Sequence, residues 1–240
     1  MAHPRPRSLA ARSPNDSLED FFARLPGLLG RMASPSERVA FERYADLLLV
    51  WNRTHRLTAA KTRAAVGQGL FLDSLLFRSL LPPSPARIAD VGAGAGIPGV
   101  PLRIVDPGVK LTMIDSRRKP VSFLRTLTRE LGLSDVDVEH GRVEELAEHE
   151  GRMCAAFDVV LSRSVRLEHA LLEASMRLVK PHGMFVASGP PPNQPAPEIR
   201  WSGVASWKTI SFESLGIERR FFIATPRELD QGPVVRYCST

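Results

Sequence analysis

A run of glycines directly after a short apolar segment is the feature that most limits how this chain can fold. Ile88–Val91 has the length and composition of a buried strand, and Gly92, Gly94 and Gly96 follow it at alternate positions. Glycine has no Cβ, so it accepts positive φ and lets a ligand approach the main chain. Pro98 then stands where a helix can begin. A strand, a glycine-rich turn and a helix N-terminus together predict a seat for a nucleotide-like cofactor.

The chain after this turn alternates between strand-like and helix-like segments. The expected strands are Ile88–Val91, Lys110–Asp115, Val136–His140, Phe157–Leu161 and Met184–Ala187. The expected helices between them are Pro98–Val105, Lys119–Leu131, Val143–Glu148 and Glu168–Leu178. This alternation predicts an α/β, Rossmann-like fold, with a mostly parallel sheet and helices on both faces. Trp207–Phe212 and Phe221–Ala224 are separated only by a short turn, and they predict an antiparallel hairpin at one edge.

Residues 17–85 predict a helical extension that precedes the α/β domain of residues 86–240 and forms one compact unit with it. Ser34-Pro35-Ser36-Glu37 combines a capping serine, a proline at the first helical position and a glutamate three residues after the cap, which is typical of a helix N-terminus. Four large apolar residues then recur at helical spacing and predict one buried helix face. These are Phe41, Tyr44, Leu48 and Trp51.

Two further helical segments are expected beside this helix. Residues 18–29 predict a short helix broken by Pro26 and Gly27, since proline removes a backbone donor. Residues 62–81 carry leucines at helical spacing, and the prolines that follow close the segment. Residues 1–16 are rich in proline and arginine without apolar periodicity, so they predict a disordered basic tail.

The composition is that of a soluble globular protein, with 43% hydrophobic and 24% charged residues. No apolar run approaches the roughly 20 residues that span a bilayer, and the N-terminus lacks the apolar core of a secretory signal. Cys154 and Cys238 have no metal-ligand spacing and fit a reducing compartment. We therefore expect a cytoplasmic protein without membrane or metal partners. The net charge of +6 is compatible with nucleic acid but does not by itself select that partner.

Two cofactors compete for the glycine-rich turn. Gly94-x-Gly96-x-x-Gly99 matches the dinucleotide fingerprint, and Asp115 follows at a distance suited to binding a ribose. Asp90-x-Gly92-x-Gly94-x-Gly96 instead places a carboxylate before the first glycine, which suits the positively charged S-adenosylmethionine. Asp115 would bind the ribose in either case. The residues favour the methyl donor, while a dinucleotide, or a glycine turn without any ligand, stays open.

Several segments resemble the GidB/RsmG family, whose members are bacterial enzymes that methylate N7 of a guanine in small-subunit ribosomal RNA. The segment Ile88-Ala-Asp-Val-Gly-Ala-Gly-Ala-Gly-Ile-Pro-Gly-Val-Pro-Leu102 is similar to the first motif of the family. Further similar segments follow the family's order, and the resemblance covers about residues 38–225. They are Leu48–Asn52, Leu57–Ala59, Leu72–Ser74, Met113–Ser116, Phe123–Arg125, Gly141–Glu145 and Val160–Arg163.

The resemblance implies a Rossmann-like class I methyltransferase fold with S-adenosylmethionine as the cofactor, and it gives roles to particular residues. It implies Gly92 and Ile97 as part of the donor pocket, Asp115 on the ribose, and Val143 and Glu144 beside the adenine. Together with the turn motif, the cofactor-binding candidates are Asp90, Gly92, Gly94, Gly96, Ile97, Asp115, Val143, Glu144 and Arg163. Arg163, which ends the fourth expected strand, and Arg142 are the catalytic candidates.

Features that other acceptors require are missing from the sequence. Methylation of an exocyclic amine is often associated with an Asn/Asp-Pro-Pro-aromatic turn after the fourth strand, where this chain has residues 162–165, Ser-Arg-Ser-Val. Methylation of a pyrimidine C5 needs a cysteine nucleophile, and neither cysteine follows that strand. Guanine N7 already presents a lone pair, so positioning can supply most of the catalysis. An RNA partner, 16S rRNA or the small-subunit particle, would meet a basic face. Its candidates are Arg117, Arg118, Lys119, Arg142 and Arg163.

Two departures from the family pattern lie on the acceptor side. Gly69-Leu70-Phe71 stands where the family usually has Arg-His, and Ser188-Gly189 is followed by prolines where Lys-Gly is common. Three alternatives therefore accompany rRNA guanine-N7 methylation. They are a methyltransferase acting on another RNA or a small molecule, a non-catalytic RNA-binding or ribosome-associated module, and, more distantly, a dehydrogenase. The oligomeric state does not follow from the sequence.

Overall fold

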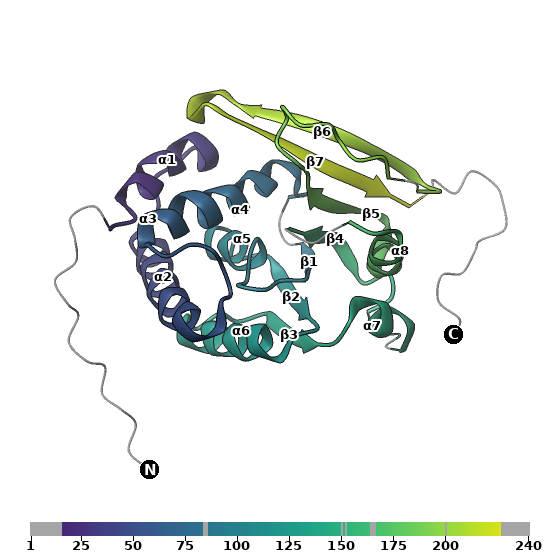
Figure 1. The fold of residues 1–240 in the computed structure, drawn as a ribbon, viewed down its shortest axis with the longest axis horizontal. Helices are drawn as coiled ribbons and strands as arrows, with labels where there is room; N and C mark the ends of the chain where they lie inside the picture. The colour runs from purple at the N-terminus through teal and green to yellow at the C-terminus, as the bar shows by residue number, and fades with distance from the viewer. Residues whose placement is uncertain are drawn as a thin grey trace, which may run out of the picture.

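One twisted sheet runs through the centre of the molecule (Figure 1). The computed structural model describes residues 16–83, 86–149, 151, 153–163, 167–199 and 201–226, and within these ranges seven strands form the sheet in the order β3-β2-β1-β4-β5-β7-β6. Their bounds are β1 Arg87–Val91, β2 Lys110–Asp115, β3 Val136–His140, β4 Phe157–Ser162, β5 Val179–Ser188, β6 Val204–Phe212 and β7 Ile217–Thr225. The first five strands are parallel and β7 and β6 are antiparallel, which confirms the predicted mostly parallel sheet with an edge hairpin.

Alternating side chains of the strands pack into two separate hydrophobic cores, one on each face of the sheet. Along β1, Ile88 packs on one face of the sheet, while Ala89 and Val91 pack on the other. Helices α5 and α6 cover the first face, and α7 and α8 cover the second (Figure 1). Their bounds are α5 Gly99–Val105, α6 Arg118–Glu130, α7 Val143–His149 and α8 His169–Leu178. This alternation is the expected pattern for strands that are covered on both faces.

The N-terminal segment adds a second layer of helices over α5. The elements are α1 Glu19–Leu29, α2 Pro35–His55, α3 Arg63–Val66, the π turn η1 Gly67–Leu72, α4 Asp73–Leu75 and the 3₁₀ turn η2 Leu76–Leu80, while η3 Glu213–Leu215 joins β6 to β7. The predicted capping box forms at the start of α2, where the Ser34 and Glu37 side chains each bind the other's backbone N–H. The basic tail predicted for residues 1–16 lies outside the described residues, apart from Asp16.

The prediction that Pro26 and Gly27 break the first helix is wrong. Helix α1 continues through both residues to Leu29 and ends at Gly30, whose φ of 68° lies in the left-handed region. Pro26 stands in the last turns of the helix, so few backbone hydrogen bonds lie beyond it. Phe21, Phe22 and Leu25 are buried in the core, and this packing holds the helix together despite the missing donor.

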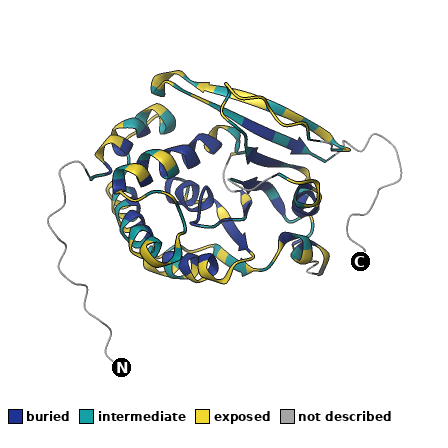
Figure 2. Ribbon diagram, in the orientation of Figure 1, coloured by how far each residue is buried: buried dark blue, intermediate teal, exposed yellow. Residues whose placement is uncertain are grey.

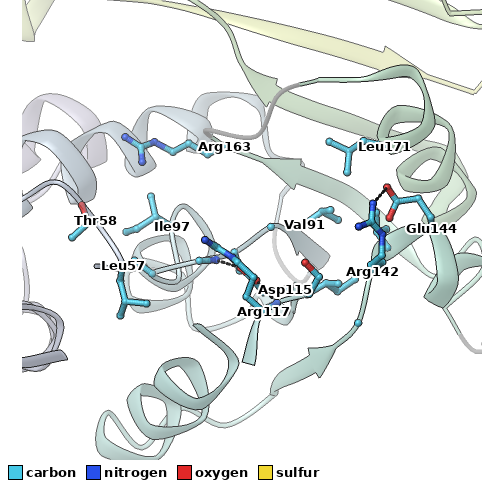
Figure 3. A pocket seen from close by; sticks show the side chains of 18 of the residues that line it. Leu57, Thr58, Val91, Ile97, Asp115, Arg117, Arg142, Glu144, Arg163 and Leu171 are labelled. Carbon is cyan, nitrogen blue, oxygen red and sulfur yellow. Dashed lines mark hydrogen bonds and ion pairs between the residues drawn. The ribbon is translucent and has the colours of Figure 1, made fainter. Parts of the chain in front are cut away.

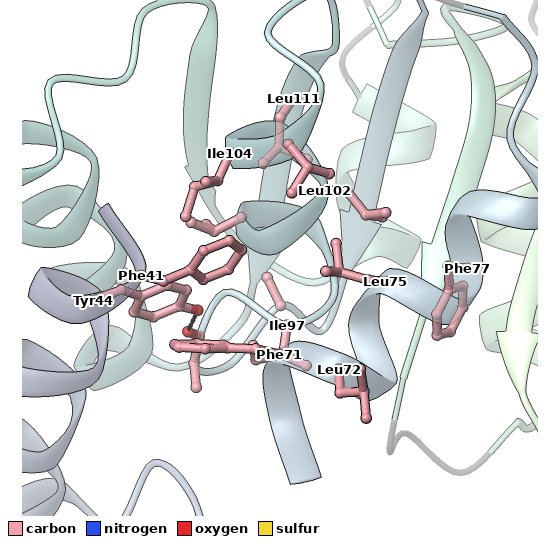
Figure 4. Packing of buried hydrophobic residues seen from close by; sticks show 14 of the residues in the cluster. Phe41, Tyr44, Phe71, Leu72, Leu75, Phe77, Ile97, Leu102, Ile104 and Leu111 are labelled. Atoms are coloured by element: carbon pink, nitrogen blue, oxygen red, sulfur yellow. Dashed lines mark hydrogen bonds between the residues drawn. The ribbon is translucent and has the colours of Figure 1, made fainter. Parts of the chain in front are cut away.

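The extension and the sheet share one hydrophobic core. Phe41 and Tyr44 of α2 pack against Phe71 of η1, with ring centroids 5.1 and 4.8 Å away (Figure 4). All seven residues of α5 are buried, because the extension covers the side of this helix that faces away from the sheet (Figure 2). Burial raises the pKa of Tyr44 well above its usual range, so its hydroxyl stays protonated and donates to the Ala95 carbonyl. The extension therefore contacts the glycine-rich turn directly.

Candidate active site

A cavity of about 900 Å³ opens where the carboxyl ends of β1, β2 and β4 meet the extension (Figure 3). Its volume is in the range of pockets that hold a nucleoside-sized ligand. Ligands of open α/β sheets bind at this edge, because the loops after adjacent parallel strands diverge there. The wall consists of Leu57, Thr58, Ala59, Leu70, Val91, Gly92, Ala93, Gly94, Ala95, Ile97, Ile114, Asp115, Ser116, Arg117, Gly141, Arg142, Val143, Glu144, Arg163, Glu168, Ala170 and Leu171.

Asp115 is the acidic centre of this wall. It is the last residue of β2 and is only 3% exposed. Its Oδ2 accepts a hydrogen bond from the Gly94 N–H at 2.9 Å, and its Oδ1 accepts from the backbone N–H of Arg117 at 2.9 Å and from Arg117 Nε at 3.2 Å. These three hydrogen bonds fix the orientation of the carboxylate. A carboxylate held in this way can accept hydrogen bonds from two ribose hydroxyls.

The glycine-rich turn forms the floor of the cavity. Gly92 and Gly94 have φ values of 72° and 56°, a conformation that glycine adopts without steric cost. The backbone N–H groups of Gly92 and Ala93 both donate to the Ile114 carbonyl, which fastens the turn to the end of β2. A Cβ on Gly94 would approach no atom closer than 3.7 Å, so the cavity side of this residue is open main chain.

Asp90 and Gly96 do not line the cavity, although the motif groups them with the other cofactor candidates. Asp90 lies between Ala89 and Val91 on β1, so its side chain points to the opposite face, where α5 begins. There its Oδ2 accepts from the Gly99 N–H at 2.8 Å. A Cβ on Gly96 would lie 2.8 Å from Tyr44 Oη. Both residues therefore support the conformation of the turn from the side that faces α5 and the extension, not from the cavity side.

The buried position of Asp90 predicts a measurable pH dependence of stability. Burial raises the pKa of Asp90 from 3.8 to about 7, against the lowering effect of the Gly99 N–H. Between these values the folded state binds a proton that the unfolded state has released, so the free energy of unfolding falls as pH rises from about 4 to about 7. The free energy of unfolding should fall by up to about 1.4 kcal/mol per pH unit in this range. Urea unfolding of Asp90→Asn between pH 4.5 and 8 should give a flatter profile than the wild type.

The exposed acid Asp137 on β3 supplies the control for this measurement. Asp137→Asn should keep the pH dependence of the wild type, because it removes a solvent-exposed carboxyl and leaves the buried one in place. Parallel profiles for the wild type and Asp90→Asn would contradict the assignment of the proton to Asp90.

The two predicted catalytic arginines lie at opposite ends of the cavity (Figure 3). Arg142 stands beside Glu144 and Leu171, and its side chain is 64% exposed; the ion pair to Glu144 has an N···O distance of 3.6 Å. Val143, next to this pair, is buried and starts α7. Arg163 instead lies on the side of Thr58 and Ile97, and its side chain is 15% exposed. The structure does not bring the two guanidinium groups together.

The end of the cavity near Arg163 is built by the N-terminal extension. Leu57, Thr58 and Ala59 form the loop after α2, and Leu70 comes from η1. The Asn52 side chain holds this loop, because its Oδ1 accepts from the Thr58 N–H at 2.9 Å and its Nδ2 donates to the Ala60 carbonyl at 2.9 Å. This wall was not predicted from the sequence, since an irregular loop carries no periodic signal that points to a sheet edge far along the chain.

Further features of the described chain bear on membranes and metals. In these ranges none of the helices has the length and apolar character that crossing a membrane requires. Among the same residues no group of three His, Cys, Asp or Glu side chains lies where it could hold a metal ion.

The parallel sheet, the glycine-rich turn after β1 and the carboxylate at the end of β2 define a Rossmann-like protein with a site for a nucleoside-containing cofactor. Residues 37–189 match the model of the GidB family, described as rRNA small subunit methyltransferase G. This match covers more than half of the chain, so the chain belongs to the GidB family and the resemblance inferred from its motifs is confirmed.

Curated relatives agree with this membership. The chain is 41% identical over 143 residues to the ribosomal RNA small subunit methyltransferase G of Mycoplasma capricolum, which is 60% of both chains. It is 36% identical over 171 residues to the protein of that name from Streptococcus thermophilus strain CNRZ 1066, 70% of this chain and 71% of the relative. The chain thus spans about three fifths of the Mycoplasma capricolum and Lactococcus lactis relatives that it matches.

The fold is also similar to that of the CMeT domain of the citrinin polyketide synthase. The TM-score is 0.51 at 15% identity, and the match covers 91% of this chain and 71% of that domain. A likeness at this identity concerns the fold alone. It confirms the predicted Rossmann-like class I methyltransferase fold.

Proposed function

We propose that this chain is a cytoplasmic methyltransferase that uses S-adenosylmethionine to methylate N7 of a guanine in 16S ribosomal RNA. The observation that carries the proposal is the Asp115 carboxylate, which faces a nucleoside-sized cavity beside the open main chain of Gly92 and Gly94. Membership of the GidB family supports both the donor and the acceptor. The names of the relatives describe methylation of ribosomal RNA in the small subunit.

The residues of the cavity fit S-adenosylmethionine. Asp115 can hold the ribose hydroxyls, and the carboxylate of Glu144 can accept from the exocyclic amine of the adenine. The apolar side chains of Val143 and Leu171 can pack on the adenine ring at the same end. Thus one end of the cavity suits adenosine, and the methionine part would extend over the glycine-rich turn toward Arg163.

A dinucleotide fits this site less well. Dinucleotide sites place a pyrophosphate on the free N–H groups at the start of the helix after β1. Here the first N–H of α5, on Gly99, donates to Asp90 at 2.8 Å, behind the cavity. The Asp90 cap therefore favours the methyl donor over NAD.

The reaction depends on positioning the acceptor against the methyl group more than on acid–base catalysis. S-adenosylmethionine supplies an activated methyl group on its sulfonium sulfur. Guanine N7 has a lone pair and loses no proton when it is alkylated, so no general base is required. The chain's contribution is to hold the acceptor in line, which can account for several kcal/mol of barrier lowering, up to about 7–11 kcal/mol. Arg163 can donate to guanine O6 or to a phosphate, while a donor placed on N7 itself would block the attack.

An RNA partner is supported by exposed cations beside the cavity. The Arg117 side chain is 69% exposed and that of Arg142 is 64% exposed, and both line the opening. Arg118 and Lys119 follow at the exposed start of α6. Contacts of this kind neutralise phosphates and release counterions, so binding should weaken steeply as salt rises.

A methyl-transfer assay tests the proposed function. Purified protein with tritium-labelled S-adenosylmethionine should label 16S rRNA in small subunits from a strain that lacks this methylation, approaching one methyl group per subunit. Borohydride and aniline treatment, which cleaves RNA at N7-methylguanine, should locate the label. Subunits from the methylated parent strain serve as the control and should take up little label. Binding of S-adenosylhomocysteine without transfer to free RNA or subunits would contradict the acceptor and favour one of the alternatives.

A further inference from the structure

Asp73 binds two arginines that come from distant parts of the chain. Arg163 Nε donates to Asp73 Oδ2 at 2.7 Å, and Arg219 Nη2 donates to Asp73 Oδ1. Asp73 lies in the short helix α4 of the extension, Arg163 directly follows β4, and Arg219 lies on β7. The side chain of Asp73 is 9% exposed. One buried carboxylate therefore connects the extension, the end of the parallel sheet and the edge hairpin.

We propose that Asp73 is a positioning residue for methyl transfer, which holds the Arg163 guanidinium in one orientation at the acceptor end of the cavity. This inference rests on the proposed function, because it concerns how the acceptor is aligned. Arg163 lines the cavity and Asp73 and Arg219 do not. Asp73 would therefore act on the reaction only through Arg163.

A second contact fixes the plane of the guanidinium. Arg163 Nη2 donates to the Gly69 carbonyl at 3.0 Å, and Gly69 belongs to the π turn η1. π turns are rare and are frequently found at functional sites. Contacts through both Nε and Nη2 leave a planar group little freedom to rotate. They use two of the five N–H donors of an arginine, so three are left for a ligand.

The location of these donors suits an acceptor better than the cofactor's adenosine. Arg163 stands on the side of Thr58 and Ile97, at the end opposite Glu144 (Figure 3). A donor that must contact guanine O6 or a phosphate without covering N7 has to be held within a fraction of an ångström. Misplacement of about 1 Å can cost on the order of a hundredfold in rate. The Asp73 carboxylate and the Gly69 carbonyl together hold the Arg163 guanidinium at two points, which meets this requirement.

Arg219 provides a matched control, because it shares the carboxylate but not the cavity. The variant Arg219→Met removes one ion pair of Asp73 and leaves the Asp73–Arg163 contact in place. The variant Asp73→Asn keeps the size of the side chain but removes the charge that both arginines bind. Both variants should lower the free energy of unfolding, because Asp73→Asn leaves Arg163 and Arg219 without their charged partner and Arg219→Met leaves Asp73 with one ion pair instead of two.

The experiment compares both variants with the wild type in three measurements. We expect Asp73→Asn to lower kcat for the small subunit about 10- to 100-fold, since it misplaces Arg163. Its Kd for S-adenosylhomocysteine should change less than about threefold, which is about 0.65 kcal/mol, because Asp115 is untouched. Arg219→Met should keep kcat within about threefold, although it also lowers the melting temperature. Phenylglyoxal labelling, read by peptide mass spectrometry, should modify Arg163 faster in Asp73→Asn and at the wild-type rate in Arg219→Met.

A variant that keeps the charge at position 73 separates the loss of positioning from the loss of the fold. Asp73→Glu preserves both ion pairs but moves the carboxylate by one methylene, so the protein should stay folded and kcat should still fall. Full kcat in Asp73→Glu, or equal losses of kcat in Asp73→Asn and Arg219→Met, would overturn the positioning role. Absence of transfer by the wild type, together with the expected labelling pattern, would instead contradict the proposed function alone.

Discussion

Asp115→Ala should bind S-adenosylhomocysteine at least about 100-fold more weakly than the wild type in isothermal titration calorimetry. A hydrogen bond to a charged group contributes about 1.5–3 kcal/mol, and this variant loses the acceptor for two ribose hydroxyls. The carboxylate is already oriented by the Gly94 and Arg117 N–H groups, so no free energy is spent on ordering it when the ligand arrives.

Two variants separate this effect from a change in the turn. Asp115→Asn keeps one oxygen that can accept a hydrogen bond and should lose less affinity than the alanine variant. Arg117→Ala keeps the carboxylate and removes the exposed side chain that contacts it, so binding should be retained or strengthened. Circular dichroism melting of all three variants reports whether the fold survives. Wild-type affinity in a folded Asp115→Ala would rule out this carboxylate as the ribose ligand.

Gly96→Ala should destabilise the fold by about 2–5 kcal/mol, because the added methyl group meets both an unfavourable backbone conformation and a packed core. Gly96 has a φ of 85°, and its new Cβ would lie 2.8 Å from Tyr44 Oη and 3.0 Å from Val100 Cγ2. Tyr44 is fully buried among aromatic rings, so it has little room to move away. Urea unfolding at fixed pH measures this loss directly.

Substitutions at two other glycines separate the conformational cost of positive φ from the steric cost of the added Cβ. Gly132→Ala adds a Cβ at a φ of 61° with no atom within 4 Å, so it should show only the conformational cost, about 1–2 kcal/mol. Gly94→Ala also avoids close contacts, but its Cβ would enter the cavity floor, so its main effect should be weaker S-adenosylhomocysteine binding. Equal unfolding free energies for Gly96→Ala and Gly132→Ala would contradict the steric argument.

The main elements of the fold were predictable because each has a local cause. Lys110–Asp115 and Val136–His140 are strands with the predicted bounds, since short runs of alternating or continuous apolar residues allow few other structures. The capping box at Ser34 fixed the start of α2, and the spacing of Phe41, Tyr44 and Leu48 predicted its buried face. The break predicted at Pro26 was wrong, because the local cost of a proline in a helix was outweighed by the tertiary packing of the buried side chains of α1.

The candidate site was predictable only in part. The turn glycines and Asp115 follow strands directly, so their place at the sheet edge could be inferred from the chain order. The wall of Leu57–Ala59 could not, because its position depends on how α2 packs over α5. Asp90 belongs to the same motif as Gly92 but lies on the other side of the turn.

The sequence by itself determined the strands, the glycine-rich turn, the acidic residue after β2 and the family, because these depend on neighbouring residues and their order. Only the tertiary structure decided what the two catalytic candidates contact. Arg142 and Arg163 each follow a strand, yet one pairs with Glu144 and the other is held by Asp73 and the Gly69 carbonyl. Asp73 and Arg163 are 90 residues apart in the sequence, and Asp73 and Arg219 are 146 apart. Contacts over such separations form only when the extension, the sheet and the hairpin pack together, and no local pattern encodes them.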